Sequence, residues 1–230
     1  MLNLSMATAH QFVALSGSNL LTDYRFEVNS LQELREVART TNNVLHEYLI
    51  DTVDMLLKCY FREYTSVVEI ATKYRSVKAK RVIDIFRVFY GGLASLVLAR
   101  DTQQDEFRQI GEKSVETMLS WKEHSVWNFE NKLMLLQAEL HALNNDFNMA
   151  RSAFQASVES ARAHNFIHEE GLALERYGLF LIENRLMNEG RKQINLAIEK
   201  YAQWGATKLV ERKCIYEIQE YGRQARFELS

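Results

Sequence analysis

Apolar side chains recur at spacings of three and four residues along nearly the whole chain, which is the pattern of amphipathic helices. The first long stripe opens after Ser30, a suitable N-cap residue with Glu33 three positions later, and continues to Leu57. Further stripes occupy positions 67–74, 82–99, 107–119, 133–143, 149–161, 172–182, 194–201 and 206–218. The pattern predicts an almost wholly helical protein with about eight to ten helices.

Residues that break helices and form turns are scarce in this chain. The 230 residues include nine glycines and no proline, and the turn dipeptides Asn-Gly and Asp-Gly do not occur. An average protein of this length would contain about a dozen prolines. Sheet-rich proteins use such residues in their loops and hairpins, so the composition favours an all-α fold of long helices joined by short turns.

Small residues recur at intervals of roughly 40 positions, the length of a pair of helices. Each of them lies twelve residues after another small residue, and the pairs are Ala99 with Gly111, Ala138 with Ala150, and Gly178 with Gly190. A small residue on each of two helices lets their backbones approach closely. The interval predicts an α-solenoid of antiparallel helical hairpins similar to tetratricopeptide (TPR) repeats, with helices about one turn longer.

The same pattern divides the chain into three segments. Periodicity is weaker before residue 30, so 1–29 is predicted to be an N-terminal extension or capping helix. Residues 30–221 form the predicted TPR-like repeat domain. Residues 222–230 are predicted to be a frayed C-terminal tail.

Charge and cysteine content argue against several classes of protein. The chain has 28 Lys+Arg against 30 Asp+Glu, and its formal net charge of −2 is unlike that of a generally basic nucleic-acid binder. Two cysteines cannot build a disulfide framework, which favours a reducing, cytoplasmic location. No apolar run reaches the roughly 18–20 residues of a membrane span, and Met1–Leu15 lacks the basic start of a signal peptide. We therefore expect a cytoplasmic protein with no nucleic-acid partner and no membrane insertion.

Candidate chemical groups are few and separate. His164 and His168 are four positions apart, a spacing that suits a metal on one helix, but Asn165 falls where a turn is expected and no third ligand is close in sequence. Cys59 and Cys214 lie on apolar stripes, which is typical of buried, unreactive thiols. No nucleophile with its base, paired acids or glycine-rich phosphate loop is visible. The sequence predicts no catalytic residue, no metal site and no cofactor.

A basic run has two interpretations. Lys73, Arg75, Lys78, Lys80 and Arg81 follow one another without an intervening acidic residue. Such runs are usually a solvated turn or helix face. The alternative is a patch that binds an anion, an acidic partner or a neighbouring domain.

The tryptophans also allow two interpretations. Trp121, Trp127 and Trp204 can pack between helix pairs, or they can line part of a concave peptide groove. For Trp204 we expect a structural corner. Tyr201 ends one apolar stripe, and Gly205 can adopt the left-handed conformation that closes a helix before the next one begins.

The stretch from Trp121 to Lys213 resembles a known family. The resemblance rests on Trp127-Asn128-Phe129, Leu136-Gln137-Ala138-Glu139, the run 161–175, and the Tyr-x-x-Trp-Gly-Ala element at 201–206. These elements are similar to the helical-repeat region of very large multidomain signalling proteins. In that family a protein-kinase-like domain and an AAA-type (STAND-class) ATPase precede the repeats, and a GAF sensor and a histidine kinase often follow.

The resemblance covers most of the chain from about residue 45, and its Tyr-x-x-Trp-Gly-Ala element is the most specific part. The glycine-rich loop of kinases, the P-loop and the phosphoacceptor motif of histidine kinases do not occur in this sequence. What the resemblance implies is therefore the repeat module alone, without the catalytic parts of the family.

Two functions are expected from these observations. The leading one is a non-catalytic helical-repeat module that acts as a protein-interaction scaffold in signal transduction. Its partner would be a protein, a peptide or a neighbouring domain of a larger signalling chain. The alternative is a stand-alone helical regulator that binds a peptide or a small effector in its concave groove.

Overall fold

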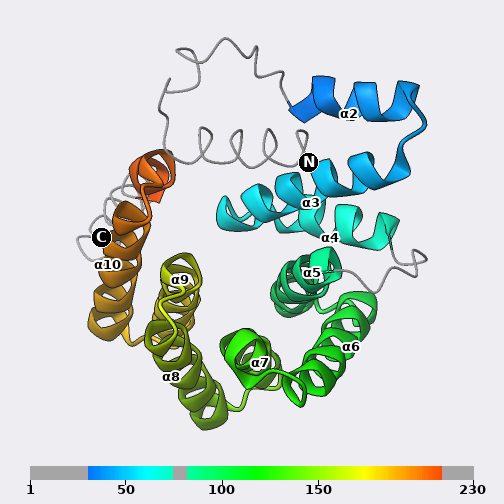
Figure 1. Ribbon diagram of the computed structural model, residues 1–230. Coiled ribbons are helices and arrows are strands. Elements are labelled where there is room, and N and C mark those ends of the chain that lie inside the picture. The colour runs from blue at the N-terminus through cyan, green and yellow to red at the C-terminus, as the bar shows by residue number, and fades with distance from the viewer. Residues whose placement is uncertain (1–30, 75–81, 214–230) are drawn as a thin grey trace, which may run out of the picture.

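Helices make up the part of the chain that the structure describes. The computed structural model describes residues 31–74 and 82–213, and these ranges contain no strand (Figure 1). The helices are α2 (Leu31–Thr40), α3 (Val44–Tyr60), α4 (Tyr64–Lys73), α5 (Val82–Thr102), α6 (Asp105–Lys122), α7 (Val126–Leu143), α8 (Phe147–Ala163), α9 (Ile167–Glu183) and α10 (Met187–Gln203). A further helix starts at Thr207 and continues to Lys213, the last described residue. The all-α class predicted from the apolar spacing is thereby confirmed.

The first apolar stripe of the sequence is divided between two helices. α2 ends at Thr40, and α3 begins at Val44 after a short turn. The side chain of Asn43 caps α3 by accepting a hydrogen bond from the backbone N–H of His46. The predicted N-terminal segment 1–29 and C-terminal tail 222–230 lie outside the described residues.

One kind of turn ends most of these helices. In each case a residue in the left-handed region, with φ between 48° and 84°, follows the last helical residues. At the α7–α8 turn the N–H of Asn145 donates to the carbonyl of Ala142, and the N–H of Asp146 donates to the carbonyl of His141. This pair of bonds is the Schellman motif, which satisfies two carbonyls at a helix end. The same two bonds recur around Asn42, Arg62, Asn165, Arg185 and Gly205.

The Schellman turns explain how the chain changes direction without proline and with few glycines. The left-handed residues Asn145, Asn165, Arg185 and Gly205 lie 20 positions apart. Asparagine tolerates the left-handed conformation, whereas arginine has no particular preference for it. Each α-helix and its turn in this half of the chain therefore occupy the same length of sequence.

The left-handed positions generate a first prediction. Replacing the exposed Arg185 with glycine should raise the free energy of unfolding by about 1 kcal/mol, because glycine has no Cβ to clash at a positive φ. Gly205→Ala should lower it by about 1–2 kcal/mol for the converse reason. Urea denaturation of the two variants and the parent measures both effects. Equal stability of all three proteins would contradict the assignment of strain to these turns.

Successive helices pack against each other along the chain. α5 packs along α6, α7 along α8 and α9 along α10, and α5 also contacts α3 and α7. In Figure 1 helices α5 to α10 follow an arc, and α3 and α4 lie across its open side. A continuous apolar core runs through α3 to α10, whereas α2 rests on a separate small cluster made by Leu34, Ala38 and Ile50.

The small residues on α9 and α10 lie at a point of close approach. A Cβ atom on Gly178 would stand 2.8 Å from the carbonyl oxygen of Gly190, and a Cβ on Gly190 would stand 2.7 Å from the carbonyl oxygen of Gly178. Ala138 and Ala150 are both fully buried on α7 and α8.

The remaining predicted pair differs in detail from Gly178 and Gly190. Ala99 is buried on α5, but the atoms nearest to a Cβ on Gly111 belong to Leu96. A Cβ on Gly111 would therefore meet a leucine side chain of α5 first, whereas Gly178 and Gly190 each face the backbone carbonyl oxygen of the other.

The α9–α10 approach generates a second prediction. Gly178→Ala places its new Cβ against a backbone oxygen and against Ile194, so the two helices must move apart. We expect the free energy of unfolding to fall by about 1–3 kcal/mol, although alanine is the better helix former. Asn195→Ala on the exposed side of α10 is the control, and it should change stability by less than about 0.5 kcal/mol. Thermal and urea melts decide the matter, and a Gly178→Ala variant as stable as the parent would exclude a close contact.

Candidate functional site

The turn between α3 and α4 reaches across the arc to helix α9. We call residues 60–64 the α3–α4 turn. The side of α9 that it contacts, together with the neighbouring side of α7, is called the inner face. Arg62 donates from Nε to Glu175 Oε1 at 2.6 Å. Glu175 is only 2% exposed, and it also accepts hydrogen bonds from Lys213 and from the hydroxyl of Tyr201. One buried carboxylate on α9 thus joins the α3–α4 turn, α10 and the last described helix.

A second buried ion pair lies beside Glu175 on the inner face. Arg176 donates to Glu139 on α7 through Nε at 2.6 Å and through Nη2 at 3.2 Å. Glu139 also pairs with Arg100 on α5 at 3.2 Å. Nη1 of Arg176 donates to the hydroxyl oxygen of Tyr64, whose ring lies 5.7 Å from the guanidinium carbon. A guanidinium that makes two hydrogen bonds to one carboxylate, with its remaining donors also paired, can be buried without leaving a charge unpaired.

Tyr60 fills the space between the α3–α4 turn and the arc. Its side chain is fully buried, and its ring centroid lies 5.9 Å from that of Tyr201, 5.3 Å from that of Trp204 and 6.1 Å from that of Tyr90. Its hydroxyl donates to the backbone carbonyl of His168 at 3.3 Å. Aromatic packing and one polar contact therefore fix the end of α3 against α9 and α10.

The surroundings of Glu175 shift its ionisation. Burial alone would raise the pKa of this carboxyl, but Lys213 and Arg62 outweigh burial and lower the pKa from 4.5 to about 2. Burial also lowers the pKa of Lys213, to about 8, although Glu175 acts in the opposite direction. The carboxylate is therefore held ionised by the cations that surround it.

This shift generates a third prediction, on the pH dependence of stability. The unfolded carboxyl has its ordinary pKa, so the stabilisation is complete above about pH 5 and is lost as the pH falls toward 2. Glu175→Gln should lower the free energy of unfolding at pH 7 by about 3 kcal/mol or more, and its difference from the parent should shrink at pH 3. Urea melts at pH 7, 5 and 3 measure this difference. Glu189→Gln, which removes an exposed pair with Arg151, is the control and should cost less than about 1 kcal/mol. A deficit for Glu175→Gln that is the same at every pH would contradict the proposed ionisation.

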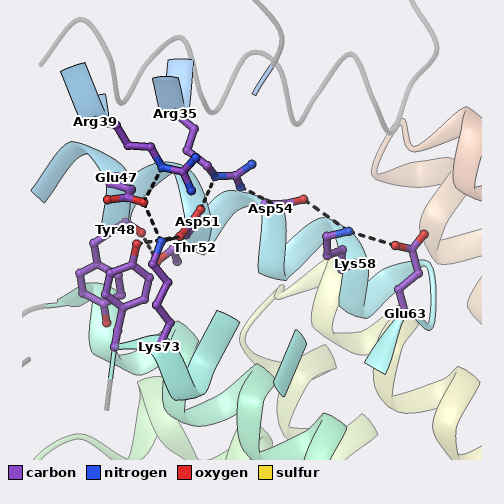
Figure 2. Close-up of polar contacts among 11 residues, drawn as sticks. Arg35, Arg39, Glu47, Tyr48, Asp51, Thr52, Asp54, Lys58, Glu63 and Lys73 are labelled. Atoms are coloured by element: carbon purple, nitrogen blue, oxygen red, sulfur yellow. Dashed lines mark hydrogen bonds and ion pairs between the residues drawn. The ribbon is translucent and has the colours of Figure 1, made fainter. Parts of the chain in front are cut away.

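A second polar network fastens α2 and α4 to α3. Asp51 is 3% exposed and accepts from Arg35 Nε at 2.6 Å and from Lys73 Nζ at 2.9 Å (Figure 2). It also accepts from the hydroxyl of Tyr74 at 2.7 Å. Burial opposes the charge of Asp51, but these three donors lower its pKa. Arg35 also extends to Asp54, as Figure 2 shows. Its Nη2 donates to Asp54 Oδ2 at 3.0 Å. The network therefore holds α2 and α4 on α3, in addition to the small apolar cluster under α2.

The predicted basic run is divided by the structure. Lys73 lies 2.7 Å from Glu47 and 2.9 Å from Asp51, so its charge is paired within the α2–α4 network (Figure 2). Arg75, Lys78, Lys80 and Arg81 lie outside the described residues. Lys73 therefore serves to hold α4 on α3, and the patch interpretation rests on the other four residues.

The predicted aromatic and histidine candidates are dispersed over separate contacts. Trp121 packs on Phe129, and Trp127 lies 4.1 Å from the ring of His164. Trp204 stacks on His168 at 5.2 Å, Gly205 has φ 84°, and the next helix begins two residues later. His164 ends α8 whereas His168 lies in the first turn of α9, and each contacts a different tryptophan. Nothing in the described ranges gathers three His, Cys, Asp or Glu side chains around a possible metal ion.

The edge formed by the starts of α7 and α9 carries exposed apolar side chains. Trp127 is 57% exposed and its neighbour Val126 is 51% exposed. Ile167, at the start of α9, is 37% exposed. Tryptophan is the residue type most enriched at the centres of protein interfaces, so this edge is a candidate contact surface.

Cys59 is a buried free thiol at the end of α3. Burial raises the pKa of the Cys59 thiol to about 12, which removes its nucleophilic thiolate at neutral pH. Cys214 lies outside the described residues. Among the helices of the described ranges, none combines the length and the apolar character that a bilayer crossing requires.

Sequence reasoning did not identify the charges of the inner face. Glu139, Glu175 and Arg176 lie within otherwise apolar stripes, and their partners are remote in sequence. The one available signal was the pair Glu175-Arg176 between Leu174 and Tyr177, because charged residues on a buried stripe require partners.

Comparisons with protein-family models, with curated proteins and with solved structures found no match to this chain.

Proposed function

We propose that this chain is a non-catalytic helical-repeat module, an α-solenoid of TPR-like hairpins, that acts as a protein-interaction scaffold in cytoplasmic signal transduction. The observation that carries the proposal is the recurrence of the same Schellman turn at 20-residue intervals between Asn145 and Gly205. Repeat arrays are built from such units, each of which contacts its neighbours. The pairing of α5 with α6, α7 with α8 and α9 with α10 supports the same architecture.

An interaction role would use the side chains that remain exposed on the edges of such an array. The described helices are stabilised by their neighbours, so the exposed edges of the array are available for other molecules. Trp127 on the edge of α7 offers a large, rigid, amphipathic side chain of the kind that anchors interfaces. The signalling context rests on the resemblance of 121–213 to the repeats of multidomain ATPase and histidine-kinase proteins.

A binding experiment with two variants tests this function and gives the fourth prediction. Proteins that co-purify with the chain are identified by mass spectrometry, and the binding of each purified candidate is then measured by calorimetry. Trp127→Ala should raise the dissociation constant for a true partner about tenfold or more. Met149→Ala, at a residue 52% exposed at the start of α8, is the matched control and should leave the affinity unchanged.

Two outcomes would contradict the proposal at different points. A partner that binds both variants as it binds the parent uses a surface other than the edge around Trp127. The absence of any saturable partner would contradict the scaffold function itself.

A second candidate function is a helical regulator that binds a peptide on the concave side of the arc. The observation that favours it is the arc that helices α5 to α10 follow, because a curved helical array presents a concave side to a peptide (Figure 1). Reading the gene on both sides of this coding segment separates the two candidates. Flanking ATPase and sensor-kinase domains would favour the scaffold, and stop codons at both ends would favour the regulator.

A further inference from the structure

We propose that the edge formed by Val126, Trp127 and Ile167 receives a short segment of a partner protein that presents a lysine or arginine beside an apolar side chain. We call these three residues the Trp127 edge. The proposal rests on the scaffold function above and adds the chemistry of the partner. In this contact the cation lies over the free side of the Trp127 ring, and the apolar side chain covers Val126 and Ile167.

The ring of Trp127 is supported on one side and open to solvent on the other. Its centroid lies 4.1 Å from that of His164, which follows the last residue of α8. His164 in turn lies 6.0 Å from the ring of Phe166 in the α8–α9 turn. Trp127 nevertheless remains 57% exposed. Tryptophan is the best aromatic acceptor for a lysine or arginine, so a supported indole with a free side suits a cation.

The charges close to the Trp127 edge in the sequence leave an excess of negative charge. Lys122 pairs with Glu130 at 3.0 Å, and Arg162 pairs with Glu170 at 2.8 Å. The cations in the last turns of α6 and α8 are therefore already paired within the chain. Glu123 is exposed in the turn that leads into α7, and it makes no ion pair with any described residue. An added cation would find a carboxylate there without displacing one of the chain's own.

The same excess extends over the surface of the described ranges. Exposed carboxylates without an ion pair include Glu69, Asp105, Glu106, Glu123, Glu159 and Glu199. Among the exposed lysines and arginines of residues 31–74 and 82–213, the ones without an ion pair are Arg185 and Lys192. A surface of this kind attracts a positively charged partner and repels an acidic one. Charge complementarity therefore favours a basic segment.

The size of the Trp127 edge favours a short segment over a second copy of this chain. A large aromatic side chain buries about 150–250 Å² in a contact, and Val126 and Ile167 are only 51% and 37% exposed. The three side chains therefore offer on the order of 300 Å², whereas each partner of a standard protein interface contributes about 800 Å². A segment of a few residues fits this area, and a stable dimer needs more.

The fifth prediction tests the chemistry of the partner. A phage-displayed library of random peptides is selected on the immobilised full chain, and the selected peptides are synthesised with a fluorescein label for anisotropy measurements. We expect lysine or arginine next to an apolar residue in the peptides that need Trp127. Trp127→Ala should raise their dissociation constants about tenfold or more. Trp127→Leu keeps an apolar side chain but has no ring, and it should still raise them about fivefold or more.

Glu123 supplies the test of charge. Glu123→Gln should raise the dissociation constants about two- to fivefold, and this effect should shrink as the salt concentration rises. Glu106→Gln removes another exposed and unpaired carboxylate at the opposite end of α6, and this matched control should bind as the parent does. Circular dichroism and thermal melts establish that each variant is folded.

Three results would overturn the proposal. Peptides that need Trp127 but carry no cation, or that bind Trp127→Leu and Glu123→Gln as they bind the parent, would reduce the contact to apolar packing and leave the scaffold function standing. A selection without any peptide that depends on Trp127 would exclude the edge as a peptide site. Self-association of the parent that Trp127→Ala abolishes, measured by sedimentation, would make a second copy the occupant. The scaffold function is tested separately on proteins that co-purify with the chain.

Discussion

A carboxylate that is removed from water must find hydrogen-bond donors, and Glu175 finds them on segments that are far apart in the chain. Arg62 belongs to the α3–α4 turn, Tyr201 to α10 and Lys213 to the helix that follows. None of these groups can be moved without leaving a charge or a polar atom unpaired in the interior. The ionised carboxylate of Glu175 therefore helps to hold α3 and α4 across the arc, together with the apolar core that they share with α5 to α10.

Two kinds of interaction act on different lengths of the chain. The Schellman turns and the close approach of Gly178 to Gly190 are local, and they fix how one helix follows the next. The Glu175 contacts and the packing of Tyr60 are long-range, and they fix how the first helices meet the last ones. The local interactions build the arc, and the long-range interactions close it.

The sequence predicted what depends on near neighbours. Helical spacing gave the all-α class, because a helix buries residues that are three and four positions apart. The partner of Glu175 could not be predicted, since Arg62 is 113 positions away and no local pattern links the two. Lys73 was grouped with the basic residues that follow it, whereas its nearest charges, Glu47 and Asp51, lie on another helix. Nor does arginine at position 62 or 185 indicate a left-handed turn, because its side chain has no intrinsic preference for that conformation.

The even spacing of the left-handed residues limits how the length of this chain can change. Inserting one residue into a helix would rotate every later side chain by about 100° around the helix axis and turn the apolar stripe toward water. Adding two complete helices with their turns would instead leave the stripes of the existing helices unchanged. A pair inserted between α4 and α9 would keep each stripe in register, yet it would carry Glu175 away from Arg62. The contact between Arg62 and Glu175 therefore requires that the helices between α4 and α9 keep their present number.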